Sequence, residues 1–334
     1  MRPPHLFAPP VTDLVSPVPV DSSGRRGPTK PQSRGPHWRR TSPGLFVPAG
    51  VDADVVEQRI VEAAARAGPR AVVTGWAALR LHGGGYFGGL RGDGSALPVP
   101  IAMNGARTAT HEGLLALRHD VPADEVVTRH GVRCASAERA LFDEMRRRRS
   151  IRAMVAAADM AFAAEITSRN RMRRYRLERR WYRDVRTVDE ALGLSEEYSW
   201  SPPETEFRLV WQCDAGWARP LCNHPVVDLS GRLVALPDLL DPVRGIVGEY
   251  AGAHHRTREQ HEDDIVREAA LRDIGLEYVE AVAADLRDFP RLVRRMDEAA
   301  RRAAEAPRTR RWRLGQRDEP DLDTRLALKA RRAS

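Results

Sequence analysis

The stretch PVVDLSGRLVALPDLLDPVRGIVGEY, residues 225–250, decides the fold of the second half of this chain. Its apolar segments 225–229 and 233–239 flank Ser230-Gly231, a pair typical of a hairpin turn. A second turn signal precedes the apolar segment 245–250. We therefore expect three consecutive antiparallel strands.

The residues on both sides of these three strands predict further helices and a strand. Ser201-Pro202-Pro203-Glu204 predicts a helix start, because serine is a favoured cap and proline fits the first turn. After the strands, the pattern predicts a helix over 257–274, a strand over 276–281 and a helix over 284–304. This order favours a mixed sheet with helices on both faces and an α+β fold class.

The first half predicts a small mixed α/β domain. A basic hairpin over 37–48 and a helix over 55–67 come first, and three helices end this half, over 136–148, 150–164 and from Thr167. A small antiparallel sheet is expected from the alternating runs 99–103, 114–119, 125–129 and 132–134. The expected organisation is a disordered arm (1–36), a first domain (37–195), a second domain (199–304) and a disordered basic tail (305–334).

The 334 residues carry a net charge of +8, and a block of arginines in 146–186 concentrates positive charge. Arginine suits phosphate contacts, which predicts DNA as a partner, although a solvated helix face explains such a block equally well. The residues predicted to contact nucleic acid are Arg146, Arg147, Arg148, Arg149, Arg173, Arg174 and Arg267.

The composition argues against a membrane protein, a secreted protein and a protein built on disulfides or a CxxC zinc site. No apolar run approaches the roughly 20 residues of a membrane-spanning helix, so no membrane partner is expected. The first residues lack the apolar core of a secretory signal, so a cytoplasmic protein is expected. The three cysteines are widely spaced and fit neither a disulfide framework nor a CxxC zinc site.

Three acids stand where the second domain would concentrate negative charge: Glu204 in the opening helix, Asp238 near the end of the second strand and Glu249 near the end of the third. Converged carboxylates repel one another, and Mg²⁺ or Mn²⁺ would relieve that repulsion. Simpler accounts stay open: Ser201 and Glu204 form a capping box, and Asp238 shapes a turn beside Asp241. Zinc held by His254, His255 and His261 is disfavoured, since no cysteine lies nearby.

Two stretches resemble known families. Residues 199–289, including SPPETEFRL, ALPDLLDP and GIVGEYAGAHHRTREQ, look like the PD-(D/E)xK nuclease-like domain of actinobacterial proteins similar to very-short-patch-repair endonucleases. The segments HWRRTSPGLFVPAG, VVTGWAALRLHG and GVRCASAERALFDEMRR look like the AbiEi-type antitoxin domain that often precedes such domains.

The nuclease resemblance implies a restriction-endonuclease-like fold and site. Glu204, Asp238 and Glu249 would be catalytic, metal-binding acids, His254 or His255 the family's histidine, and Gln260, Asp264 and Arg267 polar positions of the next helix. The sequence departs from the signature at Tyr250-Ala251, where the motif lysine is absent.

The expected function is that of a DNA-acting protein with a Mg²⁺-dependent endonuclease-like domain. The alternatives are a non-catalytic nucleic-acid-binding antitoxin or regulator with a cognate toxin as partner, and an interaction module that touches no nucleic acid.

Overall fold

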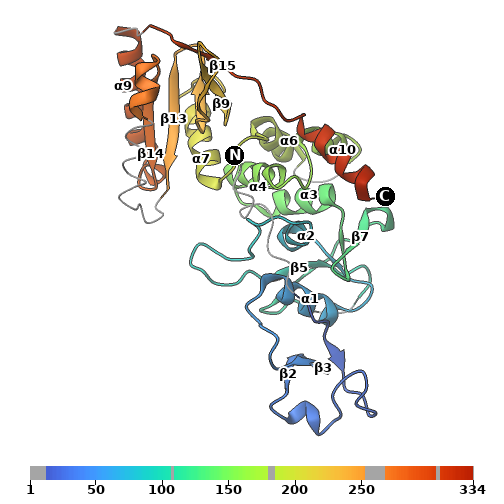
Figure 1. The fold of residues 1–334 in the computed structure, drawn as a ribbon. Helices are drawn as coiled ribbons and strands as arrows, with labels where there is room; N and C mark the ends of the chain where they lie inside the picture. The colour runs from blue at the N-terminus through green and yellow to red at the C-terminus, as the bar shows by residue number, and fades with distance from the viewer. Residues whose placement is uncertain (1–12, 107–108, 180–184, 253–267, 306–308, 334) are drawn as a thin grey trace. The chain divides into compact units, whose positions relative to one another are not determined.

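The computed structural model describes residues 13–106, 109–179, 185–252, 268–305 and 309–333 (Figure 1). The described strands form four sheets, two of them mixed, and the chain is a mixed α/β protein compatible with the expected α+β class. It divides into two compact units. The first holds residues 1–149 and 174–184, and the second holds residues 150–173 and 185–334.

A small antiparallel sheet opens the first unit. β2 (Trp38–Ser42) and β3 (Leu45–Pro48) form the expected basic hairpin, and Gly44 takes the left-handed turn position at φ 81°. β1 (Val18–Pro19) pairs with β3, and the Asp21 carboxylate accepts three backbone N–H groups of the next loop. The composition that predicted a disordered arm therefore builds ordered turns in the described part of that arm.

The main sheet of the first unit is mixed, so the expected purely antiparallel sheet is wrong. Its order is β6-β5-β4-β8-β7, in which β5 runs parallel to β6 and β4 parallel to β8. The strands are β4 (Val72–Val73), β5 (Val99–Ala102), β6 (Leu114–Leu117), β7 (Val126–Arg129) and β8 (Val132–Ala135). The chain returns to the start of β5 before forming β6, which a tight hairpin cannot do.

Three helices accompany this sheet: α1 (Val56–Ala67), α2 (Gly75–Leu81) and α3 (Ala137–Arg147). The fully buried Arg139 of α3 donates to Glu125 and Asp143, each at 2.9 Å. A buried guanidinium with two carboxylate partners satisfies its charge inside the core. This arginine is therefore structural.

The second unit is built on the four-stranded sheet β14-β13-β12-β9. Its strands are β9 (Leu221–Cys222), β12 (Leu239–Asp241), β13 (Ile246–Ala251) and β14 (Glu277–Val282), antiparallel except for the parallel pair β13–β14. One face packs on α7 (Pro202–Leu209) and α9 (Phe289–Glu305), as Phe207 and Met296 illustrate. The other face packs against Leu271, from the helical residues 268–273. Helices on both faces agree with the expected architecture.

A second sheet, of order β11-β10-β15, contains part of the predicted tail. β10 (Val226–Asp228) and β11 (Leu233–Ala235) form the expected hairpin, and β15 (Trp312–Leu314) pairs with β10. Trp312 is buried in the core, and the tail ends in α10 (Leu322–Ala333), where Leu322 is fully buried. The prediction of a disordered tail is wrong here because a few large apolar side chains anchor the segment.

Two boundaries also differ from the sequence prediction. The predicted strand 233–239 is split, since β11 and β12 belong to different sheets and Pro237, which lacks an N–H donor, lies between them. The unit boundary falls earlier than expected: α4 (Ile151–Ala163) and α6 (Val185–Leu194) belong to the second unit. Asp159 of α4 explains this assignment, because it forms a fully buried ion pair with Arg208 of α7 at 2.7 Å.

Gly248 provides a test of the packing between β13 and α7. A Cβ at this position would lie 2.8 Å from Cε1 of Phe207 and 3.2 Å from Cζ3 of Trp211. Gly248→Ala is expected to lower the free energy of unfolding by about 1–3 kcal/mol, because overpacking forces core side chains to shift. Urea denaturation measures this change. Gly92→Ala, with no atom within 4 Å of its Cβ, is the control, and equal stability of the two variants would contradict the packing.

Candidate acidic site at the ends of β12 and β13

The structure brings Asp238 and Glu249 to opposite positions on neighbouring strands. Leu239 pairs with Gly248, and one position further along this antiparallel ladder lie Asp238 and Glu249. The Oδ2 atom of Asp238 accepts the N–H of Tyr250 at 2.7 Å, which ties the aspartate to β13. Opposite residues of an antiparallel pair have Cβ atoms about 4.5–5.5 Å apart. The two carboxylates therefore share one end of the sheet.

Alternation along β13 sets the face on which Glu249 lies. Gly248 packs against Phe207 of α7, whereas Val247 belongs to the core of the opposite face. Glu249 comes two residues after Val247, so its side chain lies on the same face of the sheet as that of Val247. It is half-buried, and its Oε1 atom is buried. This carboxylate therefore loses much of its hydration, which is costly unless its charge is compensated.

Glu204 lies in the first turn of α7 and forms a helix cap. Its N–H donates to Oγ of Ser201 at 3.3 Å, and its Oε2 atom accepts the N–H of Trp200 at 2.8 Å. The same oxygen accepts a hydrogen bond from Nδ2 of Asn223 at 2.9 Å. Ser201 thus caps the helix as expected, but Glu204 accepts the N–H of Trp200, one residue before the cap, and not that of Ser201 as in a capping box. The helix cap and Asn223 together hold this carboxylate.

The described residues supply two acids for a cation, not three. They contain no group of three or more His, Cys, Asp or Glu side chains arranged to hold a metal. His254, His255, Gln260, Asp264 and Arg267 lie outside the described residues. Because Mg²⁺ is commonly held by one or two carboxylates and keeps several waters, the pair Asp238 and Glu249 fits such an ion.

Burial raises the pKa of Glu204, against opposing hydrogen bonds from Trp200, Ser201 and Asn223. The native state therefore binds the proton of Glu204 at a higher pH than the unfolded chain. Its ionisation penalises the native state above the folded pKa, and the penalty disappears as the pH falls to the ordinary carboxyl range.

Glu204→Gln keeps an acceptor oxygen and removes this penalty. Relative to the wild type, the variant is expected to be more stable at pH 8 than at pH 4, as measured by urea denaturation in EDTA. Glu112→Gln, at an exposed position, provides the control. A larger loss of stability in Glu204→Gln at pH 8 than at pH 4 would show that the ionised carboxylate stabilises the native state.

Two residues beside the acids were missed by sequence reasoning. Asn223 follows β9, donates its N–H to the carbonyl of Asp238 at 3.2 Å and has φ 44°, a left-handed conformation in which asparagine is enriched. Glu280 is the β14 partner of Glu249 and lines a polar pocket of about 270 Å³ with Arg272 and Arg295. The strand register reveals both residues. A turn-forming asparagine just before the expected strands was a sequence signal for Asn223 only.

The predicted DNA-contacting arginines fall into different environments. Arg147, Arg149, Arg173 and Arg174 are exposed. Arg148 pairs with Glu144 at 2.6 Å, and the guanidinium of Arg146 lies 5.5 Å from the ring centre of Phe142. Other arginines of the block also form ion pairs within their own units, among them Arg152, Arg171 and Arg179. Part of the basic block is therefore structural.

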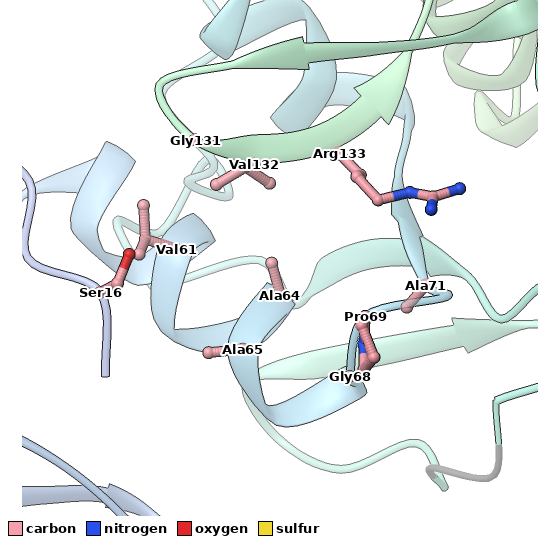
Figure 2. Close-up of a pocket in the computed structure, with 10 residues that line it drawn as sticks. All are labelled: Ser16, Val61, Ala64, Ala65, Gly68, Pro69, Ala71, Gly131, Val132 and Arg133. Carbon is pink, nitrogen blue, oxygen red and sulfur yellow. The ribbon is translucent and has the colours of Figure 1, made fainter. Parts of the chain in front are cut away.

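A pocket of about 390 Å³ lies in the first unit, between α1 and the β7–β8 hairpin (Figure 2). Small side chains such as Ala64 and Ala65 line it, with Val132 on the hairpin side. Arg133 is the one charged residue among those lining it. This lining suits a small apolar group, and the residues that form it include no acid, histidine or cysteine that could act in catalysis.

The comparisons with known proteins identify no relative. No family model matches the chain, and neither the curated proteins nor the solved structures contain a match. Among the described helices, none combines the length and the apolar character required to cross a membrane.

Proposed function

We propose that the second unit is a restriction-endonuclease-like domain that acts on DNA with a divalent cation held by Asp238 and Glu249. The observation that carries this proposal is the antiparallel register of β12 and β13, which sets the two acids opposite each other. Their carboxylates are hard oxygen ligands of the kind that Mg²⁺ and Mn²⁺ prefer.

The topology of the second unit supports the proposal. β9, β12 and β13 form an antiparallel series, and β14 then adds in parallel to β13 after the segment 252–276. α7 precedes these strands and α9 follows them, whereas β10 and β11, which cover the first predicted strand and the start of the second, lie in the other sheet of this unit. The order is compatible with the restriction-endonuclease-like arrangement that the resemblance implies.

The chain's own groups orient the acids. The N–H of Tyr250 holds Oδ2 of Asp238, and Glu249 lies opposite Asp238 on β13. A bound divalent cation would supply positive charge to phosphate oxygens and lower the pKa of a bound water. The exposed Arg147 and Arg149 would contact the DNA backbone.

The proposal is tested by incubating the full chain with supercoiled plasmid in Mg²⁺, Mn²⁺ or EDTA. Cation-dependent nicking supports the proposal when Asp238→Asn abolishes it. Absence of nicking with every cation, or equal nicking by wild type and Asp238→Asn, would overturn it.

A second function is favoured by one specific observation. The motif lysine is replaced at Tyr250-Ala251, and Glu204 is held in a helix cap, so fewer groups are available for hydrolysis than in the family pattern. A non-catalytic antitoxin or transcriptional regulator would bind DNA without cutting it, and the plasmid assay with a parallel binding assay separates the two functions.

Under either DNA-binding function, the double variant Arg147→Ala/Arg149→Ala is expected to bind DNA more weakly. Removing one arginine–phosphate interaction lowers the slope of log affinity against log salt by roughly 1, so a slope change of about 2 is expected. Fluorescence anisotropy at several salt concentrations measures it. Arg91→Ala, in an exposed loop of the same unit, is the control, and an unchanged slope in the double variant would exclude these arginines from the DNA interface.

A further inference from the structure

The pocket of about 390 Å³ in the first unit has room for a small molecule (Figure 2). Protein interiors contain few voids larger than a water molecule, and pockets that bind small ligands have volumes of about 300–1,000 Å³. Val61, Ala71 and Val132 line the pocket, and only 4%, 7% and 7% of these residues is exposed. A ligand here would therefore bury its apolar surface against side chains that already belong to the core.

Three segments of the first unit form the walls of this pocket. Ala64 of α1 points toward Val132 of the β7–β8 hairpin (Figure 2), and Ser16, in the arm before β1, forms the third wall. Gln58 of α1 holds that arm in place. Its side-chain amide donates to the carbonyl of Val15 at 2.8 Å and accepts the N–H of Val15 at 2.9 Å. Hydrogen bonds thus fix the arm against the helix beside the pocket.

Arg133 supplies the charge of the lining. Its side chain is exposed, and no carboxylate pairs with it in the described parts of the chain. The other residues that line the pocket are uncharged. One guanidinium matches an anion with a single charge, and its planar donors fit the two oxygens of a carboxylate. A phosphate dianion would find only one positive charge in this lining.

We propose that the pocket binds a small apolar carboxylate, whose hydrocarbon body lies between α1 and the hairpin and whose carboxylate pairs with Arg133. Ligand pockets combine an apolar lining with a few polar groups that fix the orientation of the ligand. The apolar walls would supply most of the affinity, and Arg133 would select a negatively charged ligand. The site lies in the first unit and does not depend on the function proposed for the second unit.

Equilibrium dialysis of the full chain with radiolabelled octanoate and octanol at low ionic strength tests the inference. The wild type is expected to bind octanoate more tightly than octanol. Arg133→Gln is expected to weaken octanoate binding about 5–10-fold and to leave octanol binding within about twofold, because it removes a charge-assisted hydrogen bond at an exposed position. Arg129→Gln is the matched control, since Arg129 is exposed on the same hairpin and is not among the residues that line the pocket.

Ala64→Leu tests where the ligand binds. Leucine is a good helix former, and its larger side chain would occupy the space between α1 and Val132. The variant is expected to weaken the binding of octanoate and octanol alike by about tenfold or more, because each methylene that a pocket cannot accommodate costs at least this factor. Ala53→Leu, at an exposed position before α1, is the control.

Each outcome supports or overturns the inference. If the wild type shows saturable binding of neither octanoate nor the aromatic acid phenylacetate, the inference is overturned. Equal binding of octanoate and octanol by the wild type, or unchanged octanoate binding in Arg133→Gln, overturns the assignment to a carboxylate. Unchanged binding in Ala64→Leu overturns the location. Should Ala64→Leu not fold, the exposed substitution Arg133→Gln decides alone.

Discussion

Glu249→Gln is expected to reduce cation-dependent nicking of plasmid at least about 100-fold. The change removes the negative charge that attracts the ion and leaves the volume of the side chain unaltered. Glu249 lies on a central strand of the sheet, opposite Asp238, and its Oε1 atom is buried. A neutral amide there would cost less to bury but would bind the cation less tightly.

Glu280→Gln is the matched control for this variant. Glu280 is the β14 partner of Glu249, so both substitutions remove one carboxylate at the same level of the sheet. Glu280 lines the polar pocket that also contains Arg272 and Arg295, and its replacement is expected to leave nicking within about twofold. An equal decrease in both variants would assign the effect to the total charge of the sheet end and contradict a specific role for Glu249.

Arg208→Ala is expected to destabilise the second unit by about 3–5 kcal/mol, the largest stability effect that we anticipate. Arg208 and Asp159 are both fully buried and lie 2.7 Å apart. Asp159 also accepts from Thr205, at 2.8 Å. Removing the guanidinium leaves a buried carboxylate without its counter-charge, which costs more than the removal of an exposed pair.

Urea denaturation of the full chain, followed by a probe in the second unit, measures this destabilisation. Arg244→Ala removes a partly exposed partner of Asp241 and is expected to cost about 1 kcal/mol or less. The double variant Asp159→Asn/Arg208→Met removes both charges and is expected to recover part of the stability. If Arg208→Ala lowers the free energy of unfolding by less than about 1 kcal/mol, the ion pair between Arg208 and Asp159 does not join α4 and α7 in a buried environment.

Local sequence signals predicted the elements that build the candidate site. Ser201 and Pro202 predicted the start of α7, and glycine before an apolar run predicted β13. The same run let us expect Asp238 and Glu249 at neighbouring strand ends, which the register of β12 and β13 shows. Caps and turns act over a few residues, so short stretches of sequence contain their signals.

Long-range partners could not be predicted in this way. Trp312 lies in a basic, proline-containing tail, and only the space beside β10 explains why it is buried. Arg139 and Arg208 belong to an arginine-rich composition, and the acidic partners that stabilise them in the core include Glu125 and Asp159, which are distant in the sequence. Asn223 shows no periodic signal, because its role comes from a left-handed backbone and contacts with three other segments.

The most direct test of the cation site is a calorimetric titration of Mn²⁺ into wild type and Asp238→Asn, each freed of metal beforehand. We predict one saturable site in the wild type and a decrease of at least about tenfold in affinity in the variant, with unchanged melting temperature in EDTA. The absence of a saturable site in the wild type, or identical affinities for the two proteins, would contradict cation binding between β12 and β13.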